Sequence, residues 1–243
     1  MPVTKSYTTK AKARRIAAAS AAIARARATL ISSRRSTALG PLRTGGFYGV
    51  YTRRGREELK VIDTQQVIAP LLTAGSIALV NGVAQGTDFT DRVGRKVVVK
   101  SIHLKYYIQA YNNVDVPLGD IARVLLVWDY QANGSLATVG DVLTNVDVLG
   151  GINLTNRERF KILYDKRHTF GAIEYTGAAP VAGDSKPVFA QRYIKCNMPM
   201  VFGGTANTIG SIQTGSMLLM VLTASSSTGY AGNFRIRTRF SDS

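Results

Sequence analysis

The sequence predicts an all-β fold: a single eight-stranded jelly roll, a kind of β-sandwich, preceded by a basic N-terminal arm. About eight segments of residues 57–243 are alternately or continuously apolar, and Gly, Pro, Asn and Asp fill the spacers between them. Eight strands with long loops fit a sandwich or jelly roll better than alternating strands and helices. The second observation is charge, because the basic residues concentrate in residues 1–56.

Residues 1–56 make up the arm. They hold 13 Lys and Arg and no acidic residue, whereas residues 57–243 hold 18 Lys and Arg and 15 acidic residues, a net charge of +3. Residues 10–30 are rich in Ala and Arg, which favour helix, and residues 32–56 are rich in Gly, Pro, Ser and Thr, which is typical of a tether. Because 13 like charges repel one another, we expect a disordered or partly helical arm that orders only against a polyanion.

The first four strands are predicted at residues 59–67, 76–80, 96–111 and 121–130. The third is the clearest, since Ile102, Leu104, Tyr106 and Ile108 alternate with polar or exposed positions. The phase of the alternation changes earlier in this strand, which predicts a bulge near Lys100. The fourth segment is continuously apolar, as expected of a strand that is covered on both faces.

The last four strands are predicted at residues 160–170, 188–198, 217–223 and 234–240. The final segment puts apolar residues and Thr238 on one face and Arg235, Arg237 and Arg239 on the other. Such an arginine stripe could line a surface that faces nucleic acid or an interface, or it could keep a sheet edge solvated and free of aggregation. The cluster of Arg92, Arg95, Lys96 and Lys100 has the same interpretations. One short helix is expected, within residues 139–149.

Composition excludes several kinds of site. With one cysteine, Cys196, the chain has no internal disulfide and no multi-cysteine metal site, and two histidines, His103 and His168, cannot form a three-histidine site. We therefore expect no metal and no cofactor. No run of about 18 apolar residues is present, so membrane insertion is not expected.

An enzymatic function is not expected either. Asp129, Asp165 and Glu174 are the carboxylates with some promise as acid or base, but they lie on different segments. The sequence contains no phosphate-binding loop, nucleophile elbow or dinucleotide fingerprint.

The arm is the predicted nucleic-acid-binding site, because its cations can release the counterions condensed on phosphates without reading sequence. An organellar presequence would have a similar composition, and the pairs Arg14-Arg15 and Arg34-Arg35 could also serve nuclear import. The predicted binding residues are Lys5, Lys10, Lys12, Arg14, Arg15, Arg25, Arg27, Arg34, Arg35, Arg43, Arg53, Arg54 and Arg56.

Four stretches resemble, in the same order, the capsid proteins of small circular single-stranded-DNA viruses that encode a replication initiator. They are RVGRKVVVKSIHLKYYI (92–108), RVLLVWDYQANGSLATVGDVL (123–143), NRERFKILYDKRHTF (156–170) and RIRTRFSD (235–242). The resemblance extends to the jelly-roll capsids of some plant satellite and small RNA viruses. It implies a jelly-roll shell domain over residues 57–243 and sixty copies assembled into a small T=1 icosahedral shell.

The sequence thus leads to the hypothesis of a capsid protein that packages single-stranded nucleic acid through its arm, with DNA favoured. The expected partners are other copies of the chain and that nucleic acid, and the expected locations are the virion and, during assembly, the host nucleus. One alternative is the capsid of a small single-stranded-RNA or satellite virus. Another is an organelle-targeted nucleic-acid-binding β-sandwich protein with a cleavable presequence.

Overall fold

The computed structural model describes residues 58–111, 119–176, 179–183, 186–225 and 229–242. The predictions made for the arm, both its order and its 13 binding residues, concern residues 1–56 and lie outside the described residues. None of the described helices is long and apolar enough to cross a membrane.

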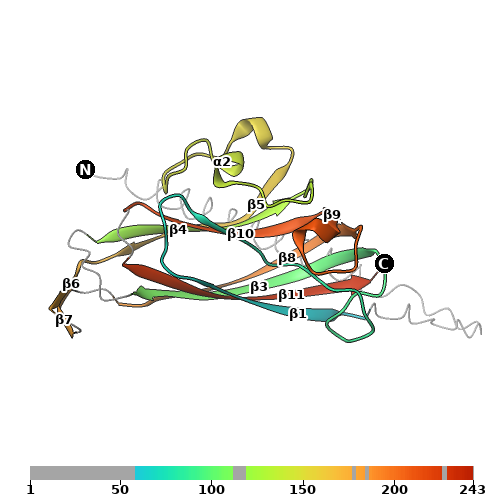
Figure 1. Cartoon of the computed structure of the whole chain (residues 1–243), viewed down its shortest axis with the longest axis horizontal. Helices are drawn as coiled ribbons and strands as arrows, with labels where there is room; N and C mark the ends of the chain where they lie inside the picture. The colour runs from blue at the N-terminus through green and yellow to red at the C-terminus, as the bar shows by residue number, and fades with distance from the viewer. Residues whose placement is uncertain (1–57, 112–118, 177–178, 184–185, 226–228, 243) are drawn as a thin grey trace, which may run out of the picture. The chain divides into compact units, whose positions relative to one another are not determined.

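Apart from a two-stranded hairpin, the described strands form two antiparallel sheets that face each other as two layers (Figure 1). The first sheet contains, in spatial order, β1 (Lys60–Ile68), β11 (Tyr230–Asp242), β3 (Lys96–Ala110), β8 (Val188–Phe202) and the short β9 (Ile212–Thr214). The second sheet contains β2 (Ser76–Leu79), β10 (Ser216–Thr223), β4 (Asp120–Asp129) and β5 (Phe160–Phe170).

The path of the chain through these sheets is that of a jelly roll. Leaving out β9, the chain runs from β1 in the first sheet to β2 in the second, then to β3 in the first and to β4 and β5 in the second. It returns through β8, crosses to β10 and ends with β11 beside β1. All eight predicted strands are present within a few residues of their expected bounds, so the predicted fold class is confirmed.

The structure differs from the sequence prediction in the connections. A hairpin of β6 (Ile173–Thr176) and β7 (Ala179–Gly183) occupies a predicted spacer, and two 3₁₀ turns, Leu154–Asn156 and Ile209–Ser211, lie in others. The expected helix within 139–149 is only the four-residue α2 (Val139–Val142). Thr138 and Asp141 begin it with a capping box, but Leu143 already forms a β-bridge with Ile152, which ends the helix.

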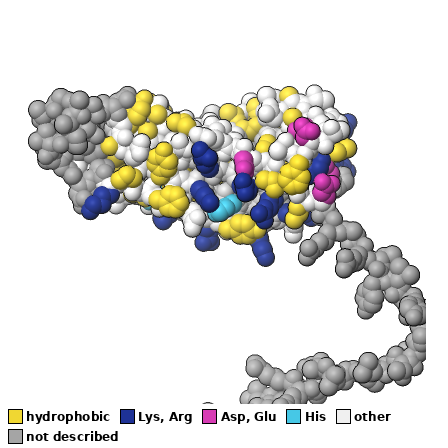
Figure 2. Space-filling model, turned by 90° about the horizontal axis from the view of Figure 1, so that it is seen from below, with side chains coloured by type: hydrophobic (Ala, Val, Ile, Leu, Met, Phe, Trp, Pro, Cys, Tyr) yellow, Lys and Arg dark blue, Asp and Glu magenta, His cyan; other side chains and the backbone are white. Residues whose placement is uncertain are grey.

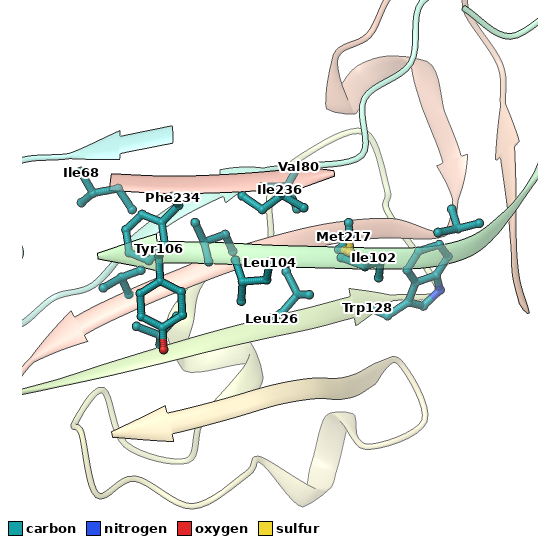
Figure 3. Close-up of a cluster of buried hydrophobic side chains, with 14 of the residues drawn as sticks. Ile68, Val80, Ile102, Leu104, Tyr106, Leu126, Trp128, Met217, Phe234 and Ile236 are labelled. Atoms are coloured by element: carbon teal, nitrogen blue, oxygen red, sulfur yellow. The ribbon is translucent and has the colours of Figure 1, made fainter. Parts of the chain in front are cut away.

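The main core lies between the two sheets, where inward side chains of β3 and β11 meet those of β4 and β10 (Figure 3). Tyr106 and Phe234 stack with their ring centroids 5.3 Å apart. The bulge predicted near Lys100 is confirmed, because the pairing register of β3 shifts between Val99 and Ser101 on both sides of the strand. The bulge restores the inward direction of the alternate apolar residues on either side of it.

A second apolar cluster covers the outer face of the second sheet. Residues 130–159, which connect β4 to β5 and are called the covering segment below, lie over this face (Figure 1). Val142 and Leu143 of this segment pack against Leu125, Leu218 and neighbouring residues of β4 and β10. The two central strands of the second sheet, β4 and β10, are therefore buried on both faces, as their continuously apolar sequences predict.

Candidate nucleic-acid interface

The outward face of the first sheet carries a cluster of basic side chains, which we call the basic face. The strand pairing brings them together in cross-strand rows of outward residues, one of which runs Asp63, Arg237, His103, Tyr193. Basic side chains gather around an imidazole on the face of the molecule shown in Figure 2. The basic residues are Lys100 and Lys105 of β3, Lys195 of β8, and Arg235, Arg237 and Arg239 of β11.

Asp63 is the one carboxylate within these rows of described residues, and it pairs with Arg237. Arg237 Nε donates to Asp63 Oδ1 at 2.7 Å, and Nη2 donates to Oδ2 at 2.6 Å. The hydrogen bond from the guanidinium, more than its charge, lowers the pKa of the Asp63 carboxyl. Both side chains are more than half exposed, so the pair orients Arg237 more than it stabilises the fold.

Four other cations of the basic face, Lys105, Lys195, Arg235 and Arg239, keep most of their charge available. Among the described residues no carboxylate forms an ion pair with Lys105, Lys195, Arg235 or Arg239. The face therefore has a concentrated positive potential on a domain whose net charge is only +3.

His103 lies in the middle of these cations. Its ring meets that of Tyr193 edge to face, with centroids 6.2 Å apart and planes at 71°. Partial burial, and then the charges of Lys105, Arg237 and Arg239, lower the pKa of His103 below its ordinary value. The imidazole is therefore neutral at neutral pH, and the positive charges around it account for part of the lowering of its pKa.

Two hollows indent the basic face, one on either side of the cross-strand row that contains Arg237, His103 and Tyr193. The first, of about 360 Å³, is lined by Lys105, Arg235, Arg237 and His103 among others. The second, of about 370 Å³, is lined by Lys100, Lys195 and Arg239 together with the ring of Tyr193. Each hollow combines at least three cations with polar neighbours, which is the chemistry that holds a phosphate.

The arginine stripe predicted on the last strand is confirmed as outward-facing, since Arg235, Arg237 and Arg239 alternate with buried residues of β11. Sequence analysis did not assign Lys105, Lys195 and His103 to the same surface. Their alternation along β3 and β8 is visible in HLKYY and QRYIK, but the register that aligns these strands with β11 involves residues more than 80 positions apart.

Of the cluster of Arg92, Arg95, Lys96 and Lys100, Arg92 is not at the surface, whereas Arg95 and Lys96 are exposed. Arg92 is fully buried, and its guanidinium lies 3.9 Å from the ring centroid of Phe202. It donates to the carbonyl oxygens of Val83, Gly94 and Gly204. Arg92 thus holds loops together inside the domain, and it is unavailable to nucleic acid.

The candidate acid and base residues have structural roles. Asp129 is buried and accepts two hydrogen bonds from Arg159, at 2.9 and 2.8 Å. Asp165 accepts two from the buried Arg123, at 2.9 and 2.7 Å. The side chain of Glu174 lies outside the described residues. The Arg159–Asp129 pair joins the covering segment to the second sheet, the Arg123–Asp165 pair joins β4 to β5, and both carboxylates are occupied by a guanidinium.

Two further residues singled out in the sequence are structural. The ring of His168 is buried, and its Nε2 lies 2.7 Å from the hydroxyl of Tyr106. Cys196 is partly buried against the main core, and burial raises the pKa of its thiol, which disfavours the reactive thiolate. The described residues contain no group of three or more His, Cys, Asp or Glu that could hold a metal ion.

The chain is similar to known viral coat proteins. The family model described as Satellite tobacco necrosis virus coat protein matches residues 56–242. A coat protein of Maize white line mosaic Satellite virus is 23% identical over 213 residues, which covers 79% of this chain and 93% of the relative. A solved structure described as Desmodium yellow mottle tymovirus is 16% identical and covers 83% of this chain and 93% of that one, with a TM-score of only 0.25.

The family model and the satellite-virus coat protein agree with the capsid class that the four sequence motifs indicate, and they correct the kind of virus. The motifs resemble capsid proteins of circular single-stranded-DNA viruses, but the family that matches is one of satellite-virus coat proteins. Loosely patterned strand motifs are shared by jelly rolls of several virus groups, so they indicated the fold and the capsid class better than the virus group. The match over residues 56–242 places the chain in the satellite tobacco necrosis virus coat protein family.

Proposed function

We propose that this coat protein assembles into a small T=1 icosahedral shell of sixty copies and packages single-stranded RNA through residues 1–56. The observation that supports this proposal is the uneven distribution of charge. Residues 1–56 hold 13 cations and no acidic residue, and they precede a nearly neutral jelly-roll domain that belongs to a coat protein family. RNA is favoured over the DNA that the motifs suggested, because the related coat proteins are those of satellite RNA viruses.

The separation of charge supports a division of labour along the chain. Each arm can offset up to 13 phosphates, so sixty arms would offset up to about 780. A domain of net charge +3 can pack against copies of itself at far smaller electrostatic cost than a domain of +16. Binding by counterion release is independent of sequence, as packaging of a whole genome requires.

A set of exposed apolar side chains supports assembly with other copies of the chain. The covering segment exposes Leu149 and Leu154 by 72% and 73%, although a monomeric domain rarely gathers such residues on one segment. Contacts with neighbouring copies would bury them. Further large apolar side chains exposed on the same segment are Tyr130, Leu136, Val146 and Ile152.

Deletion of residues 1–56 tests the role of the arm. We expect the truncated chain to keep the jelly-roll circular-dichroism signal and to lose most of the packaged nucleic acid, measured as the absorbance ratio of purified particles at two wavelengths and by extraction. A matched control keeps the arm with its residues in scrambled order, and should package normally because the binding is electrostatic. Particles of the truncated chain with full nucleic-acid content would overturn the assigned role.

Digestion of the extracted nucleic acid with ribonuclease or deoxyribonuclease tests the identity of the cargo. A ribonuclease-sensitive single strand is the expected result, and a deoxyribonuclease-sensitive one would show that the cargo is DNA. Intact-mass measurement of the particle subunit tests the presequence alternative, because a cleaved presequence would remove most of the arm. Nuclear localisation during assembly stays a prediction from the paired arginines of the arm.

A further inference from the structure

We propose that residues 47–52 of the same chain, FYGVYT, add a strand to the open edge of β1 and fill the hollow beside it. The added strand makes residues 53–59 the turn of a hairpin, and the ordered domain then begins near residue 47. This inference goes beyond packaging, because it concerns the fold of the chain in the absence of nucleic acid.

β1 is an edge strand whose outer side has no partner among the described residues. It pairs only with β11, from Lys60 opposite Phe240 to Ile68 opposite Gly232, without a shift of register. No hydrogen bond from the described part of the chain reaches the main chain on its other side. Proteins usually protect such an edge with proline, a bulge or charges, but β1 has neither proline nor bulge and one exposed charged residue, Asp63. An edge this long and regular calls for a cover.

A hollow of about 540 Å³ lies beside this edge, with apolar and acidic side chains in its wall. Val61 and Ile62 of β1 line it on one side, and Phe89 of the loop between β2 and β3 lines it on the other. The ring of Phe89 is 56% exposed, which is costly for an aromatic side chain that nothing covers. Asp63 and Asp91 also line the hollow. It therefore suits an apolar segment that is accompanied by cations.

The loop that carries Phe89 is held in place, so the hollow exists before anything fills it. Lys60 Nζ, at the start of β1, donates to the carbonyl oxygen of Asp91 at 2.8 Å, and Figure 1 shows this loop beside β1. Within the loop, Arg92 N donates to the carbonyl oxygen of Ala84, and Gly86 N donates to that of Arg92, both at 3.0 Å. A preformed wall loses little conformational entropy when a segment binds against it.

The chain supplies a matching segment directly before β1. Residues 47–51 contain three of the four aromatic residues of the arm, and Phe, Tyr, Val and Thr are residue types that favour strands. An Arg-Arg-Gly-Arg stretch follows at residues 53–56, and its glycine favours a turn that returns the segment antiparallel to β1. The aromatic rings then cover Phe89 and the apolar residues of β1, and the arginines of the turn lie within reach of the two carboxylates.

The tether favours this segment over a strand from another copy. A connection of seven residues, 53–59, spans about 15 Å as a flexible coil, which exceeds the spacing of about 4.8 Å between neighbouring strands. So short a tether gives an effective concentration in the millimolar range, without association of two chains. Of the 13 cations of the arm, three lie in the proposed turn and ten precede residue 47, and these ten remain for nucleic acid.

Two pairs of full-length variants test the added strand from its two sides. Val50→Pro removes a backbone donor and blocks the pairing of the segment, and Ala38→Pro makes the same change elsewhere in the arm. Phe89→Ser removes one wall of the hollow, and Val93→Ser changes an exposed residue of the same loop that does not line it. Circular dichroism establishes that all four variants are folded.

The measurement is hydrogen exchange of the nucleic-acid-free chain, followed by mass spectrometry of peptides that cover residues 47–52 and 60–68. In the wild type both peptides should exchange at least about tenfold more slowly than in Val50→Pro, because strand pairing protects the amides of both strands. Phe89→Ser should lose part of this protection, and the two controls should keep it. Residues 47–52 that exchange as fast in the wild type as in Val50→Pro would overturn the proposal.

Dilution distinguishes a cover from the same chain from a cover by another copy. Pairing within one chain does not depend on concentration, so the exchange rates should stay constant over about a hundredfold dilution. Protection that disappears on dilution would show that a second copy covers the edge, and would overturn the proposal. All four variants keep the 13 cations of the arm, so the nucleic-acid content of their particles tests packaging separately from the added strand.

Discussion

At the scale of single residues, several polar groups inside the domain are held by specific partners. His168 illustrates this, because its buried ring contacts the Tyr106 hydroxyl, which also lies 2.8 Å from the Tyr164 hydroxyl. Burial, and then the charge of Lys166, lowers the pKa of His168. The structure therefore selects the neutral imidazole.

This environment predicts that acid weakens the fold. An unfolded chain protonates His168 near pH 6.5 whereas the folded chain resists it, so the unfolded state binds more protons and stability falls as pH drops below this value. We expect the free energy of unfolding to fall between about pH 7 and about pH 5, by up to about 1.4 kcal/mol per pH unit from this group. Urea unfolding at several pH values measures it.

The variant His168→Gln keeps a polar partner for Tyr106 and cannot titrate in this range. Its unfolding free energy should depend less on pH than that of the wild type. His103→Gln is the comparison, because the pKa of His103 is also lowered but its ring is more exposed than that of His168. An unchanged pH dependence in His168→Gln would show that other groups cause the acid effect.

His103 offers a second prediction, about ligand binding. Its pKa is lowered in part by Lys105, Arg237 and Arg239, so phosphates bound among these cations should raise the pKa of His103. NMR titration of the histidine ring signals with and without a short single-stranded RNA measures the change. The buried His168 serves as internal control and should keep its pKa. A shift in neither ring would mean that RNA does not reach this part of the face.

At the scale of elements, two arginines fix the position of the covering segment through hydrogen bonds and one ion pair. Arg123 is 2% exposed and donates to the carbonyl oxygens of Val148 and Gly150 as well as to Asp165. Arg159 joins the end of the same segment to Asp129. Apolar packing alone is not directional, and these hydrogen bonds fix one position of the segment on the second sheet.

Two arginines of this segment make a matched pair of variants. Arg159→Gln leaves the fully buried Asp129 carboxylate without its cation, so we expect a loss of about 3 kcal/mol in the free energy of unfolding. Arg157→Gln removes a cation whose partner Glu158 is 90% exposed, and should change stability by less than about 0.5 kcal/mol. Denaturant midpoints compare the two. Equal losses would contradict the structural role of the Arg159–Asp129 pair.

At the scale of the whole domain, its two sheets have different surroundings. No described residue covers the basic outer face of the first sheet, whereas the second is covered by a segment that exposes apolar side chains. This asymmetry is what a shell subunit needs, with one surface for a polyanion and others for neighbouring copies.

Assembly should therefore depend on the covering segment. The double variant Leu149→Ser, Leu154→Ser should stay folded, since both side chains are exposed in the single chain, and should assemble only at higher concentration. If each side chain is buried between copies, its loss costs about 1.5–3 kcal/mol, or more than tenfold in the association constant. Light scattering against concentration measures assembly. Val67→Ser, an exposed residue of β1, is the control; assembly of the double variant at wild-type concentrations would contradict this role.

The sequence by itself determined the fold class and the strands. Alternation places Ile102, Leu104 and Tyr106 on one face of β3, and continuous apolar runs identify β4 and β10, because these patterns follow from the local geometry of a half-buried or fully buried strand. The charge division at residue 56 is also a property of the sequence, and so is the outward stripe of β11.

Only the tertiary structure decided which charges act together. Arg92, Arg123 and Arg237 look alike in sequence, yet the first two are buried structural residues and the third lies on an exposed face. Lys105, Lys195 and Arg235 form one surface only because β3, β8 and β11 pair in a particular register. That register is fixed by packing among residues far apart in the chain, and short-range sequence patterns do not contain it.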